Sequence, residues 1–137
     1  MSETKKFDYN DKGKKYSFDD LAEIISILRS PGGCPWDIKQ THESLKECLI
    51  EESGEVISAI DNRDDDNLCE ELGDLLLQVL MHAQIAAEED RFDINDVIQG
   101  ISEKMIRRHP HVFGDVQVSS PEESLQLWKK IKEQEKA

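Results

Sequence analysis

The sequence predicts an all-α protein, a helical bundle of about five helices whose core is completed by dimerisation. Apolar residues recur at the three- and four-residue spacing of helices in five segments, and no segment alternates with a period of two for long enough to predict a strand. One long segment is apolar almost all round, which predicts burial on several sides. In a chain of only 137 residues, that burial indicates a second subunit.

The first two elements follow from capping and breaker residues. Residues 1–16 are polar with five lysines and are predicted to be a flexible tail, whereas residues 17–137 are predicted to form a single domain. Ser17 is the expected N-cap of a helix that runs to about Arg29, with an apolar stripe formed by Leu21, Ile24, Ile25 and Leu28. Residues 30–33 (SPGG) end this helix, and residues 34–37 are expected to continue as a loop.

Four further helices are predicted by the same spacing. The second runs from near Thr41 to about Asn62, and the third from about Asp66 to Glu89. The fourth begins near Asp93 or Asn95 and ends before Pro110, because a proline disfavours the helical conformation of the residue before it. The last opens with an N-cap, a proline and two glutamates, and carries Leu125, Trp128 and Ile131.

Composition excludes several classes of protein. Thirty Asp and Glu against 17 Lys and Arg give a net charge of −13, which argues against binding polymeric nucleic acid. No apolar run approaches the roughly 20 residues of a membrane span, and residues 1–10 lack the apolar stretch of a secretory signal. Three widely spaced cysteines support neither a zinc ribbon nor a disulfide framework, so we expect reduced thiols in a cytoplasmic protein.

The acidic residues are concentrated in one window of the chain. Twelve of them lie between Glu43 and Asp74, where only Lys46 and Arg63 oppose them, so this window carries −10 of the net charge. The ordinary interpretation of such a run is a solvated helix face.

The helical wheel places four of these acids toward the interior. Glu52 falls inside the apolar stripe of the second helix and Glu55 on its border, while Glu71 and Asp74 fall among the apolar residues of the third. Because helices joined by a short turn are normally antiparallel neighbours, the four can face one another across a groove.

Buried carboxylates must be protonated, paired with bases or bound to a cation, and the motif holds no lysine or arginine. Oxygen ligands suit a hard ion such as Mg²⁺, with Mn²⁺ as a substitute. The alternative is that long glutamates reach solvent from the edge of the stripe. That alternative is favoured for Glu51 and Glu70, and the metal is favoured for Glu52 and Asp74. The spacing fits neither a ferritin-like di-iron site nor an EF-hand.

A second candidate group is basic. Lys104 and Arg108 share a helix face next to Arg107, and Trp128 and Lys132 are also four residues apart. These residues could bind phosphate and stack a base, or the cations could pair with the surplus acids, and spacing does not decide between the two. Trp128 taken alone is more often a core residue.

Four sequence segments, in the same order along the chain, resemble the MazG nucleotide pyrophosphohydrolase family, and the resemblance covers about residues 21–136. They are GGCPWDIKQTHESLKECLIEESGEVISAI, EELGDLLLQVLMHAQIAAE, KMIRRHPHVFGDV and LWKKIKEQEK. The family pattern EExxE followed by ExxD stands here at residues 51–55 and 71–74. Two differences are that many members carry two such domains in tandem, and that many have a basic residue just before ExxD, where this chain has Asn67.

The resemblance implies an all-α fold, a homo-oligomer (dimer or tetramer) and Mg²⁺-dependent cleavage of nucleoside triphosphates to monophosphate and pyrophosphate, in nucleotide-pool housekeeping. It implies metal ligands at Glu52, Glu55, Glu71 and Asp74, and nucleotide contacts at Lys104, Arg108, Trp128 and Lys132, with Arg107 beside them. Glu51 or Glu55 is the candidate to take a proton from the attacking water. The alternatives are a non-catalytic nucleotide-sensing or regulatory module on the same fold, or a relative narrowed to one substrate such as dUTP, dCTP or a damaged nucleotide.

Overall fold

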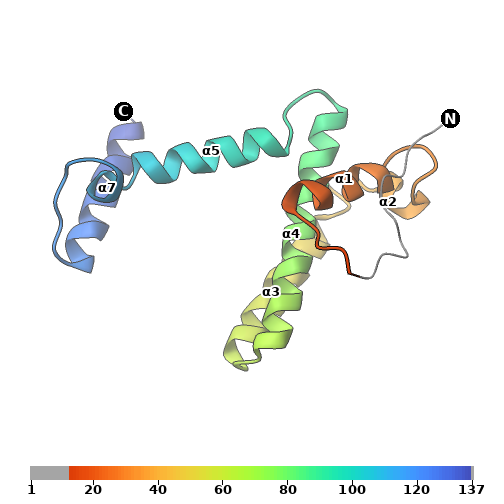
Figure 1. The fold of residues 1–137 in the computed structure, drawn as a ribbon, viewed down its shortest axis with the longest axis horizontal. Coiled ribbons are helices and arrows are strands. Elements are labelled where there is room, and N and C mark those ends of the chain that lie inside the picture. The colour runs from red at the N-terminus through yellow and green to blue at the C-terminus, as the bar shows by residue number, and fades with distance from the viewer. Residues whose placement is uncertain (1–12, 137) are drawn as a thin grey trace. The chain divides into compact units, whose positions relative to one another are not determined.

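The computed structural model describes residues 13–136, and this part of the chain contains seven helices and no strand (Figure 1). The all-α fold class is therefore confirmed. The five predicted helices are present. One additional short helix occurs in the segment expected to be a loop, and another at residues 110–113, for which the sequence analysis predicts no helix. Most of the predicted tail, residues 1–12, lies outside the described residues. The chain divides into two compact units, one up to Ile94 and one from Asn95 onward, and each is described by itself.

The first unit contains α1 (Phe18–Leu28), α2 (Pro35–Lys39), α3 (Lys46–Asp61) and α4 (Asp65–Glu88). Ser17 caps α1 as predicted: its hydroxyl accepts a hydrogen bond from the backbone N–H of Asp20, and the Asp20 carboxylate accepts one from the backbone N–H of Ser17. The predicted loop after α1 is wrong in one part, because Pro35 starts the short helix α2, on which Trp36 is 57% exposed. The fixed φ angle of proline suits the first turn of a helix.

The helix predicted from Thr41 starts five residues later. Thr41 and Ser44 exchange hydrogen bonds instead: the Thr41 backbone N–H donates to the Ser44 hydroxyl at 2.8 Å, and the Ser44 N–H to the Thr41 hydroxyl at 3.1 Å. Such local side-chain bonds compete with helix formation, so this segment forms a turn. The turn delivers Leu45, which is 1% exposed, into the core at the start of α3.

The helices α3 and α4 lie side by side and form a hairpin (Figure 1). Asp64 caps α4 by accepting the Asn67 backbone N–H, and Arg63 in the connecting turn has a positive φ of 52°. α1 also packs on α4. The core between these helices consists of five buried residues, Ile25, Leu45, Leu80, Met81 and Ile85.

A buried arginine ties the α2 segment to the end of α4. The Arg29 side chain is only 6% exposed, and its Nε and Nη2 atoms each donate to the Glu88 carboxylate at 2.9 Å. Its Nη1 atom donates to the backbone carbonyl groups of Asp37 and Gln40. Because one guanidinium holds both segments, it fixes the approach of the chain to the turn before α3.

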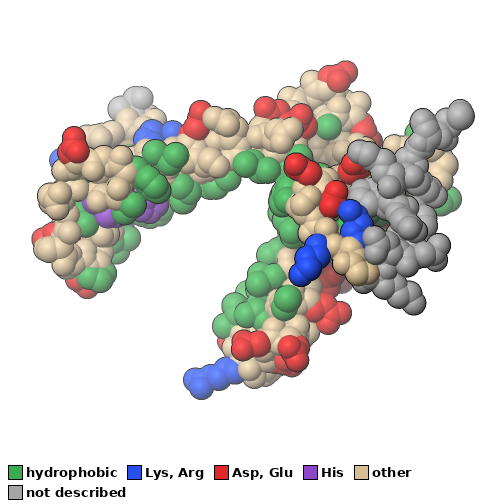
Figure 2. Space-filling view, viewed as in Figure 1, with side chains coloured by type: hydrophobic (Ala, Val, Ile, Leu, Met, Phe, Trp, Pro, Cys, Tyr) green, Lys and Arg blue, Asp and Glu red, His purple; other side chains and the backbone are tan. Residues whose placement is uncertain are grey.

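The hairpin carries apolar side chains that nothing in the first unit covers. Figure 2 shows apolar surface along one side of the hairpin. The large apolar residues that are exposed on α3 and α4 are Leu49, Ile50, Ile57, Ile60, Leu72 and Val79. Among the apolar residues of the second predicted helix, Leu45 is buried, whereas Ile60 is 56% exposed. The predicted stripe is thus only partly covered within this unit.

The second unit contains α5 (Ile94–Arg107, whose first residue belongs to the first unit), α6 (Pro110–Phe113) and α7 (Pro121–Lys136). α5 ends before Pro110, and the Ser120 hydroxyl accepts the Glu123 N–H at the start of α7, as predicted. Five apolar residues of α5 are exposed: Val97, Ile98, Ile101, Met105 and Ile106. No helix among residues 13–136 has the length and apolar character needed to cross a membrane.

Candidate metal centre

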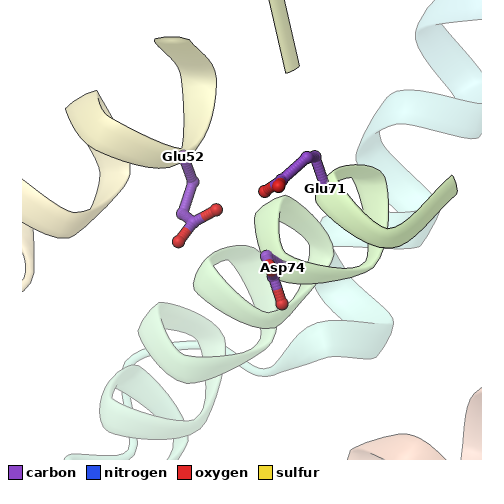
Figure 3. A group of neighbouring side chains, drawn as sticks. All are labelled: Glu52, Glu71 and Asp74. Atoms are coloured by element: carbon purple, nitrogen blue, oxygen red, sulfur yellow. The ribbon is translucent and has the colours of Figure 1, made fainter. Parts of the chain in front are cut away.

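Three carboxylates converge between α3 and α4. Glu52 extends from α3 toward Glu71 and Asp74, which lie one turn apart on α4 (Figure 3). One oxygen from each side chain can be chosen so that all three oxygens lie within 4.8 Å of one another. The spacing of three residues between Glu71 and Asp74 places both on one face of α4, and the short turn after α3 places Glu52 opposite them.

The surroundings of these acids disfavour their charged forms. Burial raises the pKa of Glu52, and the negative charges of Asp74 and Glu55 raise it further. Burial also raises the pKa of Glu71, with Glu55 and Asp74 adding to the effect. A cation held between the carboxylates would reverse this balance, because it favours their ionised forms.

One oxygen of the cluster lacks a hydrogen-bond partner. Glu52 Oε2 is buried and accepts no hydrogen bond from any described residue. No lysine or arginine forms an ion pair with Glu52, Glu71 or Asp74 among the ion pairs of the described part of the chain. An acidic group with a buried, unpaired oxygen and no basic partner fits a divalent cation bound through oxygen ligands.

The other two predicted acids lie at the margin of the cluster. Glu55 is exposed and is not one of the three converging residues, but its charge acts on both Glu52 and Glu71. Glu51 is also exposed, and its charge acts on Glu52. Of the four predicted ligands, the structure thus brings three together and places Glu55 beside them.

The predicted basic residues all lie in the second unit, on α5, α7 and the residue after α5. Arg107 Nε donates to Glu135 at 2.6 Å, and Arg108 Nη2 donates to the same carboxylate at 2.9 Å. These hydrogen bonds lower the pKa of Glu135 to about 2. Both arginines are therefore paired with an acid. Pairing with an acid was one of the two interpretations between which the sequence spacing did not decide.

The indole ring of Trp128 is in contact with two cations of the same group. Lys132 Nζ is 4.3 Å and the Arg108 guanidinium carbon 5.7 Å from the centre of the indole ring. Lys104 is half-buried one turn before Arg108. The spacing of four residues predicted the contact between Trp128 and Lys132, whereas Glu135 as the shared partner of both arginines was not predicted.

A cavity of about 410 Å³ lies beside this tryptophan. Its lining consists of His109, His111, Ser124, Leu125 and Trp128. His111 Nδ1 is buried without a hydrogen-bond partner among the described residues. Sequence reasoning did not predict the two histidines as lining residues, although the sequence His109-Pro110-His111 directly follows the basic residues and could have indicated them.

Known proteins resemble this chain over most of its length. Residues 40–113 match the sequence family described as the MazG nucleotide pyrophosphohydrolase domain. The chain is 57% identical over 121 residues to a Bacillus subtilis protein named uncharacterized protein YabN, covering 88% of this chain and 25% of that one. It is 60% identical over 119 residues to a Thermotoga maritima protein named nucleoside triphosphate pyrophosphohydrolase/pyrophosphatase MazG, and the match covers 87% of this chain and 45% of that protein. An Escherichia coli K12 protein named nucleoside triphosphate pyrophosphohydrolase is 48% identical over 120 residues, and the match covers 87% of this chain and 46% of that protein.

The chain spans between a quarter and about half of the length of these three relatives. One solved structure is matched over nearly its whole length. The crystal structure of a mazG-related protein from Thermotoga maritima is similar with a TM-score of 0.69 and 37% sequence identity, covering 84% of this chain and 98% of that one.

Proposed function

Because the chain belongs to the MazG nucleotide pyrophosphohydrolase family, we propose that it hydrolyses nucleoside triphosphates to monophosphates and pyrophosphate with a divalent cation. The observation that carries the proposal is the convergence of Glu52, Glu71 and Asp74, together with the buried Oε2 atom of Glu52, which has no hydrogen-bond partner among the described residues. The names of the Thermotoga and Escherichia relatives support the reaction type. Removal of unwanted nucleotides from the (d)NTP pool is the proposed role, with Mg²⁺ as the cation and Mn²⁺ as a substitute.

Glu52, Glu71 and Asp74 would hold the metal, and Glu55 would complete or flank the set. A bound Mg²⁺ supplies positive charge that neutralises the carboxylates and the triphosphate and polarises the phosphorus under attack. Glu55 is exposed and close enough to act on the charge of two ligands, so it is the better-placed residue to accept a proton from water. Glu51 acts on Glu52 alone and is the second candidate.

The basic group of the second unit is proposed to contact the nucleotide. Lys132 and Arg108 beside the Trp128 ring combine positive charge with an aromatic surface, which suits phosphate and base. Arg107 and Lys104 add charge on α5. The role of this basic group is proposed independently of the metal centre. A measurement of nucleotide binding, without hydrolysis, tests it.

The uncovered apolar side of the α3–α4 hairpin is proposed to be covered by a second copy of the chain. Six large apolar residues of α3 and α4 are exposed, and a monomer rarely leaves a large apolar patch in water. A homodimer or a tetramer would bury them. Light scattering of the purified chain measures the oligomeric state directly, and a monomer at micromolar concentration would contradict this proposal.

Pyrophosphate release tests the reaction. The purified chain is incubated with a panel of ribo- and deoxyribonucleoside triphosphates, with Mg²⁺ or with a chelator, and pyrophosphate is measured. We expect release only with the metal. Binding of triphosphate without release would instead support the nucleotide-sensing module, whereas release with the chelator would exclude the metal mechanism.

A further inference from the structure

Two histidines that are 40 residues apart in the sequence are in direct contact in the first unit. His42 lies in the turn before α3, and His82 lies on α4. Their Nδ1 atoms are 2.7 Å apart, and the two rings are parallel within 1° with centroids 5.0 Å apart. Both side chains are half-buried, and His82 Nε2 is buried without a partner among the described residues.

The contacts of this pair determine where the ring protons are. A guanidinium can only donate hydrogen bonds, and Arg91 Nη2 lies 2.6 Å from His42 Nε2. His42 Nε2 is therefore the acceptor, and the proton of His42 is on Nδ1. That proton is donated to His82 Nδ1, so the proton of His82 is on Nε2, and both rings are neutral.

A second proton on either ring breaks this arrangement. Protonating His42 places an N–H of a cation against the Arg91 guanidinium, and protonating His82 places two N–H groups against each other. Each event removes one hydrogen bond and brings two donors together. Burial lowers the pKa of His82, and His42 lowers it further.

The neighbouring charged groups are already paired. Arg91, from the loop after α4, is bound to Glu89 with a shortest distance of 2.7 Å. Glu88 at the end of α4 is bound to Arg29, which follows α1. Glu43, next to His42, is exposed. Among these charged groups, Arg91 is the one in contact with the histidine pair, through Nε2 of His42.

We propose that His42 and His82 form an acid-sensitive clip that holds the turn before α3 against α4 while both rings are neutral, and that opens when either ring is protonated. The turn is stabilised internally, because Thr41 and Ser44 bond to each other and the Ser44 hydroxyl donates to Gln40 at 2.7 Å. Opening the clip thus loosens the attachment of the turn rather than the turn itself. Leu45, which follows, then loses its fixed place in the core.

Ring-nitrogen NMR of the full chain tests the proton positions. At pH 8 we expect His42 with its proton on Nδ1 and His82 with its proton on Nε2. On acidification we expect the His82 ring to stay neutral below the ordinary histidine pKa of about 6.5. Opposite tautomers, or titration of His82 at its ordinary value, would overturn the clip. This readout needs no substituted protein.

Amide hydrogen exchange tests the opening. In the wild type we expect exchange at residues 42–48, corrected for its intrinsic pH dependence, to rise at least tenfold as the rings become protonated. Replacing both histidines, His42→Gln together with His82→Gln, removes both titrating groups and should abolish the acid-dependent rise. His109→Gln, in the second unit, is the matched control and should leave the rise unchanged. A rise that persists in the folded double variant would overturn the proposal, and if that variant does not fold, the wild-type titration decides.

Discussion

Glu52 on α3 and Glu71 on α4 belong to one carboxylate cluster, and burial raises the pKa of both. A raised pKa means that the folded, metal-free protein binds protons more tightly than the unfolded chain. The contribution of these two groups to the free energy of unfolding is therefore lost as the pH rises from their ordinary pKa of 4.5 through their raised pKa values. The two acids face each other at a cost to the fold, which a bound cation would offset.

The first prediction concerns Glu52→Gln. Removing one charge should raise the melting temperature of the metal-free protein at pH 7, because repulsion within the cluster falls. The same change should reduce Mg²⁺-dependent pyrophosphate release about 100-fold or more, since a metal ligand is lost. Calorimetry with EDTA and with Mg²⁺, together with the release assay, separates the two effects. The exposed Glu70→Gln serves as the control, and full activity in Glu52→Gln would show that the metal site is wrongly assigned.

The second prediction concerns Glu135, which neutralises two guanidinium groups. Its pKa of about 2 keeps it ionised at every ordinary working pH, so Arg107 and Arg108 stay paired. Glu135→Gln should therefore increase the positive charge available to a triphosphate and tighten nucleotide binding several-fold. Titration calorimetry measures the Kd, with Glu133→Gln as the control on the same helix. Weaker binding in Glu135→Gln would mean that this acid positions the arginines rather than competing with the substrate.

The third prediction concerns Arg29. Arg29→Met removes the donors to Glu88 and to two backbone carbonyl groups, and we expect the free energy of unfolding to fall by about 2–3 kcal/mol. Arg29 lowers the pKa of Glu88, so this contribution is present above pH 4.5 and is lost as the pH falls through the lowered value. Urea denaturation at pH 7 and pH 4 measures both effects. Glu88→Gln should cost less than Arg29→Met, and equal stability of Arg29→Met and wild type would contradict the structural role of Arg29.

The fourth prediction concerns Gln78, which is 7% exposed on α4. Its Oε1 atom is buried and accepts no hydrogen bond from the described residues. Gln78→Met has a similar length without the polar atoms, so we expect the free energy of unfolding to rise by about 1 kcal/mol. Thermal unfolding measures the change. A decrease would show that Oε1 has a partner outside the chain, such as bound water or a second subunit.

The fifth prediction concerns the uncovered side of the hairpin. Ile57 is 59% exposed on α3, and a charge there would be buried if a second copy covers it. Ile57→Asp should therefore shift the protein toward monomer in light scattering while its helical circular dichroism is retained. Ser58→Asp, at the next position and also exposed, is the control. An unchanged oligomer in Ile57→Asp would place the interface elsewhere.

Helix positions were predictable because they depend on local signals. The Ser17 cap, the break before Pro110 and the Ser120 start of α7 all appear where the sequence places them. The start of α3 was not predicted, because the hydrogen bonds between Thr41 and Ser44 compete with the helix in a way that apolar spacing does not reveal. The family inferred from the motifs is confirmed.

The candidate site was predictable where it depends on helical periodicity. The wheel placed Glu52, Glu71 and Asp74 on facing sides of two neighbouring helices, and the structure brings them together. Pairings between distant segments were not predictable, since nothing local indicates that Glu135 binds Arg107 or that His42 contacts His82. These contacts depend on tertiary packing, which a periodicity argument does not contain.

The two tryptophans of the chain fall in different units, Trp36 on α2 and Trp128 on α7. Trp36 is 57% exposed, so its emission should be that of a solvated indole, while Trp128 lies against two cations. Trp36→Phe leaves Trp128 as the intrinsic fluorophore of the second unit, and because its two cations move away on unfolding, its emission should change. The molecule thus supplies its own optical reporter for the second unit in the intact chain, whereas the solvated Trp36 should change little when the first unit unfolds.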